Sequence, residues 1–239
     1  SSPSSQSGPS SRPSRWAYYP LTAAVCVYTV TDRVSNPFGF QPDCARFVPG
    51  YGYVNAAFHV IGHHPGVHGG AETQIPFSNG AGGRLLRALA RADLLASPQV
   101  PPRVNATYLS YLHLCVPEGG APDRRSHLAC EPFLDAEVRA IAAHVLLPVG
   151  RAATAHVLRT YSAQGRRLAA GMHRLHAQEI VGSGFLIMPI AEPAHWSPAE
   201  AHALTEALVR LQETDYRREA DLGRFLAEGG SYFVRGDAI

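Results

Sequence analysis

Four short apolar runs alternate along the chain with segments of helical periodicity. The runs are AAFHVIG (56–62), TYLSYLHLC (107–115), HVLLPVG (144–150) and GFLIMPI (184–190), and their length and composition indicate buried strands. Because strands that alternate with helices form parallel sheets covered on both faces, this order predicts an α/β fold. We expect a three-layer αβα sandwich with a central four-stranded parallel sheet.

The segments between the runs carry apolar residues at the spacing of one helix face. Residues 81–95 place four leucines near one face, and residues 133–145 repeat the pattern from Phe133 to Ile141. A third helix is expected over residues 151–161, directly after the third run. A fourth should begin near Ser197, because serine, proline and glutamate follow one another there in the order typical of a helix start.

The composition predicts one domain of ordinary size. The 239 residues are 46% hydrophobic and 17% charged, which is enough to bury a core. Residues 1–15 are rich in serine and proline and lack apolar periodicity, so we expect a disordered tail followed by a single domain over residues 16–239. No run reaches the roughly 20 apolar residues of a membrane helix, and the N-terminus lacks a signal-peptide core. We therefore expect a monomeric, cytoplasmic protein.

All 21 basic residues are arginine, and the chain contains no lysine. Arginine forks suit phosphate groups, although codon bias in a GC-rich genome explains the same excess. The formal net charge of +2 is too small to indicate a nucleic-acid-binding protein by itself. Without lysine no side-chain Schiff base can form, so any mechanism must use another nucleophile.

The segment GHHPGVHGG, from Gly62 to Gly70, follows the first apolar run. Ligands of parallel α/β sheets bind beyond the carboxyl ends of the strands, so we expect this loop at the ligand-binding edge. Its glycines allow backbone N–H groups to turn toward an anion. Metal binding and simple turn formation are the other interpretations. The nearby histidines His59, His63, His64 and His68 lack the fixed helical spacing of a zinc site, so metal binding is not our prediction.

Several motifs carry a resemblance to a known family. VIGHHPG, followed by ETQIPF and AGGRLLRAL, resembles the first motif of the uracil-DNA glycosylase superfamily, especially its iron-sulfur branch. The segment that begins YLHLC is similar to the branch's second strand, cysteine-bearing loop, long helix and third strand. The similarity extends roughly from Asn36 to Trp196. It implies a DNA repair glycosylase of base excision repair, with damaged DNA as its partner.

The resemblance also implies site residues. The catalytic candidates are His63, where the branch has an acidic residue, and His195, the only histidine in the segment that matches the family's His-Pro-Ser motif. Phe77 would stack on the flipped base, a contact worth about 1–3 kcal/mol. Tyr111 replaces a base-reading asparagine. These replacements indicate altered specificity or lost activity. The base-binding candidates are Gly62, His64, Pro65, Gly66, Phe77 and Tyr111.

The cysteines raise the question of a 4Fe-4S cluster. Cys115 and Cys130 resemble two of the family's ligands and Cys44 a third, but the family's Cys-x-x-Cys pair is absent and Cys26 is remote. Because a cubane cluster needs four converging thiolates, we predict no metal and no cofactor. If a cluster is present, these four cysteines are its ligands. We expect small buried thiols rather than disulfides.

Three functions remain open. The first is a monofunctional DNA glycosylase that uses water to hydrolyse the N-glycosidic bond of a damaged or deaminated base, with uracil as the leading candidate. The second is a nucleic-acid-binding relative that kept the fold and lost the catalytic residues. The third is a phosphate- or nucleotide-binding α/β protein unrelated to repair, which would share the glycine-rich loop but not the order of the other motifs.

Overall fold

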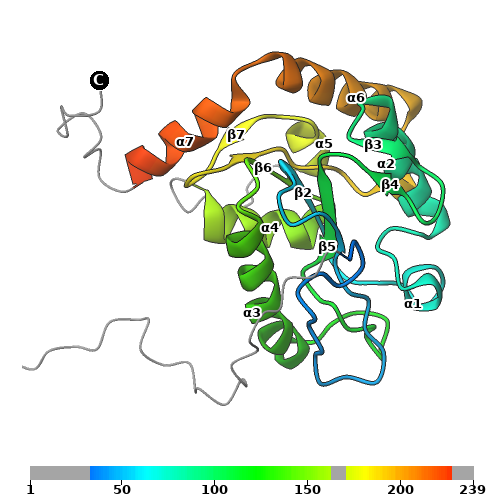
Figure 1. Ribbon diagram of the computed structural model, residues 1–239. Coiled ribbons are helices and arrows are strands. Elements are labelled where there is room, and N and C mark those ends of the chain that lie inside the picture. The colour runs from blue at the N-terminus through cyan, green and yellow to red at the C-terminus, as the bar shows by residue number, and fades with distance from the viewer. Residues whose placement is uncertain (1–32, 163–170, 228–239) are drawn as a thin grey trace, which may run out of the picture.

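The computed structural model describes residues 33–162 and 171–227, and the side chains of α7 up to Asp221 (Figure 1). A six-stranded sheet in the order β1-β5-β2-β6-β8-β7 forms its centre. The tail predicted for residues 1–15 lies outside the described ranges. The strands of the sheet are β1 (Tyr51–Gly52), β2 (Phe58–Gly62), β5 (Thr107–Tyr111), β6 (Val145–Pro148), β7 (Ile180–Val181) and β8 (Leu186–Ile187).

The four predicted apolar runs form the parallel part of this sheet. β2 lies between β5 and β6 and pairs in parallel with both, and β6 pairs in parallel with β8. The edge strands β1 and β7 are antiparallel to their neighbours, so the sheet is mixed rather than purely parallel. A separate hairpin joins β3 (Leu95–Ser97) to β4 (Arg103–Val104). The predicted α/β sandwich is confirmed, with two short edge strands added.

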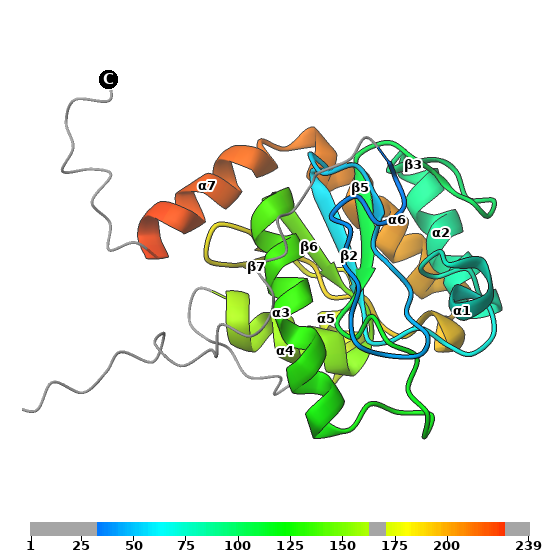
Figure 2. The ribbon, with the colours of Figure 1, turned by 60° about the horizontal axis from the view of Figure 1, so that its bottom comes forward.

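Helices cover both faces of the sheet (Figure 2). Neighbouring residues of one strand point to opposite faces. Val60 accordingly packs with α2 and α6, whereas Ile61 packs with α3 and α4. The helices are α1 (Gly70–Thr73), α2 (Gly80–Arg91), α3 (Arg124–Ile141), α4 (Gly150–Tyr161), α5 (Met172–Leu175), α6 (Pro198–Glu213) and α7 (Tyr216–Ala227), with the 3-10 helix η1 (Pro193–His195) before α6. Within the described residues, none of these helices has the length and apolar character required to cross a membrane.

Capping side chains set the positions at which α3 and α6 begin. The predicted start of α6 is confirmed, because Ser197 and Glu200 form a capping box around its first turn. α3 begins nine residues before its predicted pattern at Phe133, with Asp123 accepting a hydrogen bond from the N–H of Ser126 at 2.7 Å. Pro132 lies inside this helix. Because proline lacks an N–H donor and usually interrupts helices, the sequence did not predict a helix over the residues that precede it.

Candidate active site

A cavity of about 320 Å³ opens at the carboxyl edge of the parallel strands. Each of the four strands contributes a residue to its wall at or after its end: Gly62 from β2, Tyr111 from β5, Val149 from β6 and Glu192 from β8. This cavity lies where a parallel sheet is expected to bind its ligand. It is named the base pocket here because the family resemblance implies that a flipped base would enter it. Its remaining wall residues are His63, His64, Gly66, Phe77, Asn79, Ala81, Gly82 and Pro193.

Phe77 and Tyr111 form the aromatic floor of the base pocket. The hydroxyl of Tyr111 accepts a hydrogen bond from the backbone N–H of Phe77 at 2.9 Å, and the two ring centroids lie 5.1 Å apart. Gly62 has to be glycine here, because a Cβ atom would lie 2.7 Å from the Tyr111 ring and 2.9 Å from the Phe77 ring. Burial raises the pKa of Tyr111 to about 12, so its hydroxyl keeps its proton and can donate it to a ligand oxygen.

His63 is half-buried in the wall and is uncharged at neutral pH. Burial, reinforced by His64 and His127, lowers the pKa of His63 to about 4. The His63 ring lies 4.7 Å from the ring of His64, measured between centroids. His64 contacts the carbonyl of Pro65 through Nδ1 at 3.1 Å. A neutral imidazole suits the orientation of a water molecule better than the pairing with a phosphate that a protonated His63 would make.

A row of histidine rings continues behind His63. His113 lies next to it, with ring centroids 5.6 Å apart, and Nε2 of His113 is 2.9 Å from Nδ1 of His127. His156 follows, with its ring 5.7 Å from that of His127. Burial lowers the pKa of His113 to about 3 and that of His156 to about 4. His113 and His156 are therefore neutral at pH 7, and His113 is the ring of this row that contacts His63.

Glu192 brings a carboxylate to the mouth of the base pocket. A Cβ atom on Gly150 would lie 2.9 Å from Oε2 of Glu192, so the carboxylate sits over the first residue of α4. Glu192 is exposed by its accessible surface, yet the surrounding protein removes part of its water shell and raises its pKa, while His195 and His64 act in the opposite direction. No sequence motif singled out Glu192 as a site residue. It precedes Pro193 and Ala194, and a search of the strand-end segment for carboxylates as well as histidines would have found it.

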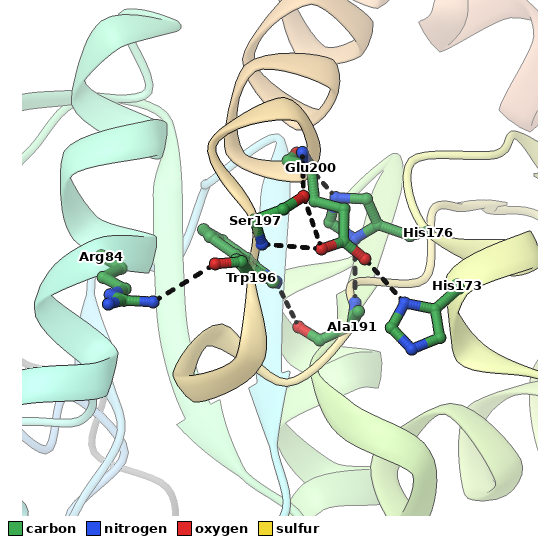
Figure 3. Close-up of polar contacts among 7 residues, drawn as sticks. All are labelled: Arg84, His173, His176, Ala191, Trp196, Ser197 and Glu200. Atoms are coloured by element: carbon green, nitrogen blue, oxygen red, sulfur yellow. Dashed lines mark hydrogen bonds and ion pairs between the residues drawn. The ribbon is translucent and has the colours of Figure 1, made fainter.

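The segment that carries Glu192 is anchored by polar contacts on each side (Figure 3). Nδ1 of His176 accepts from the N–H of Ala191 at 3.0 Å, and Nε2 of His176 lies 2.9 Å from the carbonyl of Glu200. Since an amide N–H can only donate, His176 is neutral with its proton on Nε2. Trp196 donates from its indole nitrogen to the carbonyl of Ala191 at 2.8 Å. These bonds hold the backbone next to Glu192 in one position.

Two further contacts fix the far end of the same segment. The Glu200 carboxylate accepts from the N–H of Ser197 at 2.8 Å and lies 2.7 Å from Nδ1 of His173. Arg84 of α2 reaches across to the carbonyl oxygen of Trp196 at 3.4 Å (Figure 3). The segment is therefore tied to α2, α5 and α6 together.

Two of the predicted site residues lie outside the base pocket. His195 is exposed on η1 and lines a neighbouring cavity of about 180 Å³, which shares only Glu192 with the base pocket. Pro65 is buried within the loop from Gly62 to Gly70, with its Cβ 3.5 Å from the position of a Cβ on Gly70. His59 packs within its strand, where Nε2 lies 2.7 Å from the Ser110 hydroxyl. The exposed His68 contacts Glu72 instead.

The cysteine arrangement corrects the expectation of unpaired thiols. Cys44 and Cys115 form a disulfide with their Cα atoms 6.2 Å apart, on the wall of a cavity of about 780 Å³. Backbone hydrogen bonds pair the two segments, from the N–H of Val48 to Leu114 and from the N–H of Val116 to Arg46. This pairing brings together cysteines separated by 71 residues in sequence. The sequence pattern did not indicate it.

The described cysteines do not fit a four-thiolate cluster. The disulfide occupies two of the candidate ligands, and Cys130 is a free thiol buried in α3. Cys26 lies outside the described residues. Throughout residues 33–162 and 171–227, no three histidine, cysteine or acidic side chains converge so as to hold a metal ion.

Comparison with known proteins agrees with this geometry. The uracil DNA glycosylase superfamily profile matches residues 49–212. The type-5 uracil-DNA glycosylase of Mycobacterium tuberculosis is 28% identical over 77% of this chain and 69% of its own length. The type-4 uracil-DNA glycosylase of Saccharolobus solfataricus, from the iron-sulfur branch, is 25% identical over 80% of this chain and 86% of its own length. The profile match spans all four parallel strands and the base pocket, and the chain belongs to the uracil-DNA glycosylase superfamily.

Proposed function

We propose that this protein is a monofunctional DNA glycosylase that hydrolyses the N-glycosidic bond of a damaged or deaminated base flipped out of DNA. Uracil is the first base to test, because the relatives named above are uracil-DNA glycosylases. The observation that carries the proposal is the base pocket. It combines an aromatic floor with a carboxylate at its mouth and polar groups on its walls.

The floor and walls supply the contacts that a flipped base needs. Phe77 offers its ring for stacking, and the Tyr111 hydroxyl offers one proton to a base oxygen. Asn79 accepts from the N–H of Gly82 through its side-chain oxygen at 2.6 Å. Its amide nitrogen, near Gly66, stays available as a donor. Donors placed toward the leaving base stabilise the negative charge that develops on it.

Glu192 and His63 are assigned to the attacking water. As a carboxylate, Glu192 accepts a proton from water as the oxygen bonds to C1′ of the sugar. The C1′–N bond breaks, its electron pair leaves with the base, and the base takes its proton from solvent. Neutral His63 orients the water by a hydrogen bond. Because the chain has no lysine, the reaction ends at the abasic site and does not continue through a Schiff base.

His195 acts on the reaction only through its electrostatic effect on Glu192. A protonated His195 would lower the pKa of Glu192 and so favour the carboxylate that accepts the proton. It lies in the neighbouring cavity, beside the base pocket rather than within it. We therefore assign proton transfer to Glu192, and we assign to His195 only an effect on the protonation of Glu192.

An oligonucleotide cleavage assay tests the proposal. Single- and double-stranded oligonucleotides carrying uracil, hypoxanthine or a mismatched thymine are incubated with the protein, treated with alkali and resolved on a gel. Strand breaks that require alkali are the expected result. A Glu192→Gln protein prepared in parallel controls for a contaminating glycosylase, since its cleavage should fall. DNA binding without excision of any of the three bases would instead favour the catalytically impaired relative.

A further inference from the structure

A second groove lies beside the base pocket, between α2 and the start of α6. Three arginines of α2, Arg84, Arg87 and Arg91, are exposed and form one wall. Their spacing of three and four residues places them on one face of the helix. The groove encloses about 260 Å³, and its other lining residues are Ala88, Trp196, Ser197, Pro198 and Ala201.

This arginine groove begins where the base pocket ends. Ala81 and Gly82, in the first turn of α2, line the base pocket, and Arg84 follows two residues later. Nη1 of Arg84 lies 3.5 Å from the carbonyl of Pro193, which is also a wall residue of the base pocket. At 1.5 Å per helical residue, Arg91 lies about 10 Å beyond Arg84 along the axis. If one nucleotide of a DNA strand occupies the base pocket, the adjacent nucleotides of that strand can extend to Arg87 and Arg91.

No residue that the structure describes neutralises the positive charge of the groove. No carboxylate lies within 4.0 Å of the guanidinium groups of these three arginines in the part of the chain that the structure describes, where the ion pairs join histidine to glutamate. Glu200 is the acidic residue of the adjacent segment, and its carboxylate is engaged by Ser197 and His173. It lines the neighbouring cavity rather than the arginine groove.

We propose that Arg87 and Arg91 bind phosphodiester groups of the substrate DNA strand next to the flipped nucleotide. Guanidinium groups present paired N–H donors that match phosphate oxygens. Arg84 has a structural role instead, because its guanidinium donates hydrogen bonds to the carbonyl oxygens of Pro193 and Trp196. This inference rests on the proposed function, since the base pocket sets where the strand passes.

The test compares two double variants that lose the same charge. R87Q/R91Q removes the groove charge, and R210Q/R218Q removes two exposed arginines of α6 and α7 that do not line the groove. Undamaged fluorescent oligonucleotides, single- and double-stranded, are titrated by anisotropy at several salt concentrations. R87Q/R91Q should bind about tenfold more weakly than the parent, and the slope of log K against log salt should fall by about 1.5, as expected for two lost phosphate contacts. The control should change both quantities much less.

The outcomes separate this inference from the proposed function. Equal losses in the two variants, or no DNA binding by the parent, would overturn the inference. Excision is scored separately with the parent on damaged oligonucleotides. If the parent protein excises no base but R87Q/R91Q still binds DNA more weakly than the control variant, the inference stands and the proposed function is wrong. If the parent protein excises a base but R87Q/R91Q binds DNA as well as the control variant does, the proposed function stands and the inference about the arginines is wrong. Equal thermal midpoints of the two variants exclude unfolding as the cause.

Discussion

The Tyr111 hydroxyl accepts a hydrogen bond from the backbone N–H of Phe77 at 2.9 Å, although the two residues are 34 positions apart in sequence. Phe77 has a φ of 60°, a left-handed conformation that a bulky residue rarely adopts. The end of β5 therefore fixes the backbone of Phe77, the residue that we propose to stack on the flipped base.

Tyr111→Phe should destabilise the protein. The N–H of Phe77 would be left buried without an acceptor, at a cost of about 1–3 kcal/mol. The thermal midpoint, measured by calorimetry, should fall by roughly 2–10 °C. Tyr53→Phe, at an exposed tyrosine, is the matched control and should leave the midpoint near that of the parent. A Tyr111→Phe midpoint equal to the control would show that this hydrogen bond contributes little.

Phe77→Ala should weaken the binding of DNA that carries a damaged base by about 1–3 kcal/mol, because the ring no longer stacks on the base. Binding of undamaged DNA should change little. The two affinities are measured by anisotropy on oligonucleotides that differ only in the damaged base. Thermal midpoints recorded alongside detect a loss of folding. Equal weakening on both oligonucleotides would assign Phe77 to the core rather than to the base.

Glu192→Gln should lower the single-turnover excision rate by about 10²–10⁴-fold, since the amide cannot accept the proton of water. The affinity for damaged DNA should remain close to that of the parent. Glu206→Gln, an exposed change on α6, is the control. The parent rate should rise with pH through a pKa above the usual range of glutamate, and this dependence should disappear in Glu192→Gln. An unchanged rate in the variant would remove Glu192 from the mechanism.

Glu137 should make the protein less stable as pH rises from about 4.3 to about 8. Burial raises the pKa of Glu137 to about 8, and Tyr108 donates a hydrogen bond to its Oε1 at 2.8 Å. The folded state thus binds a proton that an unfolded chain releases near pH 4.3, and folding stability declines between those values. Urea unfolding at pH 6.5 and 8.5 should show a loss in the parent and a smaller one in Glu137→Gln.

Working above pH 6.5 isolates this effect from the histidines. Burial lowers the pKa of His59 to about 3, so its stabilising effect is lost only as pH falls below the unfolded value of about 6.5. His63, His113 and His156 act in the same direction. An equal alkaline loss in the parent and Glu137→Gln would rule out Glu137 as its source.

Opening the disulfide between Cys44 and Cys115 should lower stability by about 4 kcal/mol, because it closes a loop of 71 residues. Cys44→Ser/Cys115→Ser should reproduce the effect of a reducing agent in urea unfolding, and should remove the parent's response to that agent. Peptide mapping without reductant should recover the two cysteines in one linked peptide. Unlinked peptides from a preparation that contains stoichiometric iron would instead indicate that they are cluster ligands.

Local pattern was sufficient to predict the parallel part of the sheet, but not the antiparallel edge strands β1 and β7. The apolar runs that became β2, β5, β6 and β8 are continuous in sequence, and burial on both faces of a parallel sheet requires such runs. The glycine-rich loop after β2 could be placed at the ligand-binding edge for the same reason. Capping residues indicated the start of α6, whereas Pro132 hid the first half of α3.

Tertiary structure alone decided how the site is assembled. The hydrogen bond between Tyr111 and Phe77, the disulfide, and the position of Glu192 over α4 all join segments that are distant in sequence. Local propensity carries no information about such contacts, because they depend on which strand ends meet at one edge of the sheet. The sequence was sufficient to predict that the ligand-binding loop lies at the carboxyl edge of the parallel strands, where a cavity opens. The order of the strands decided that Glu192, rather than His195, would face the base pocket.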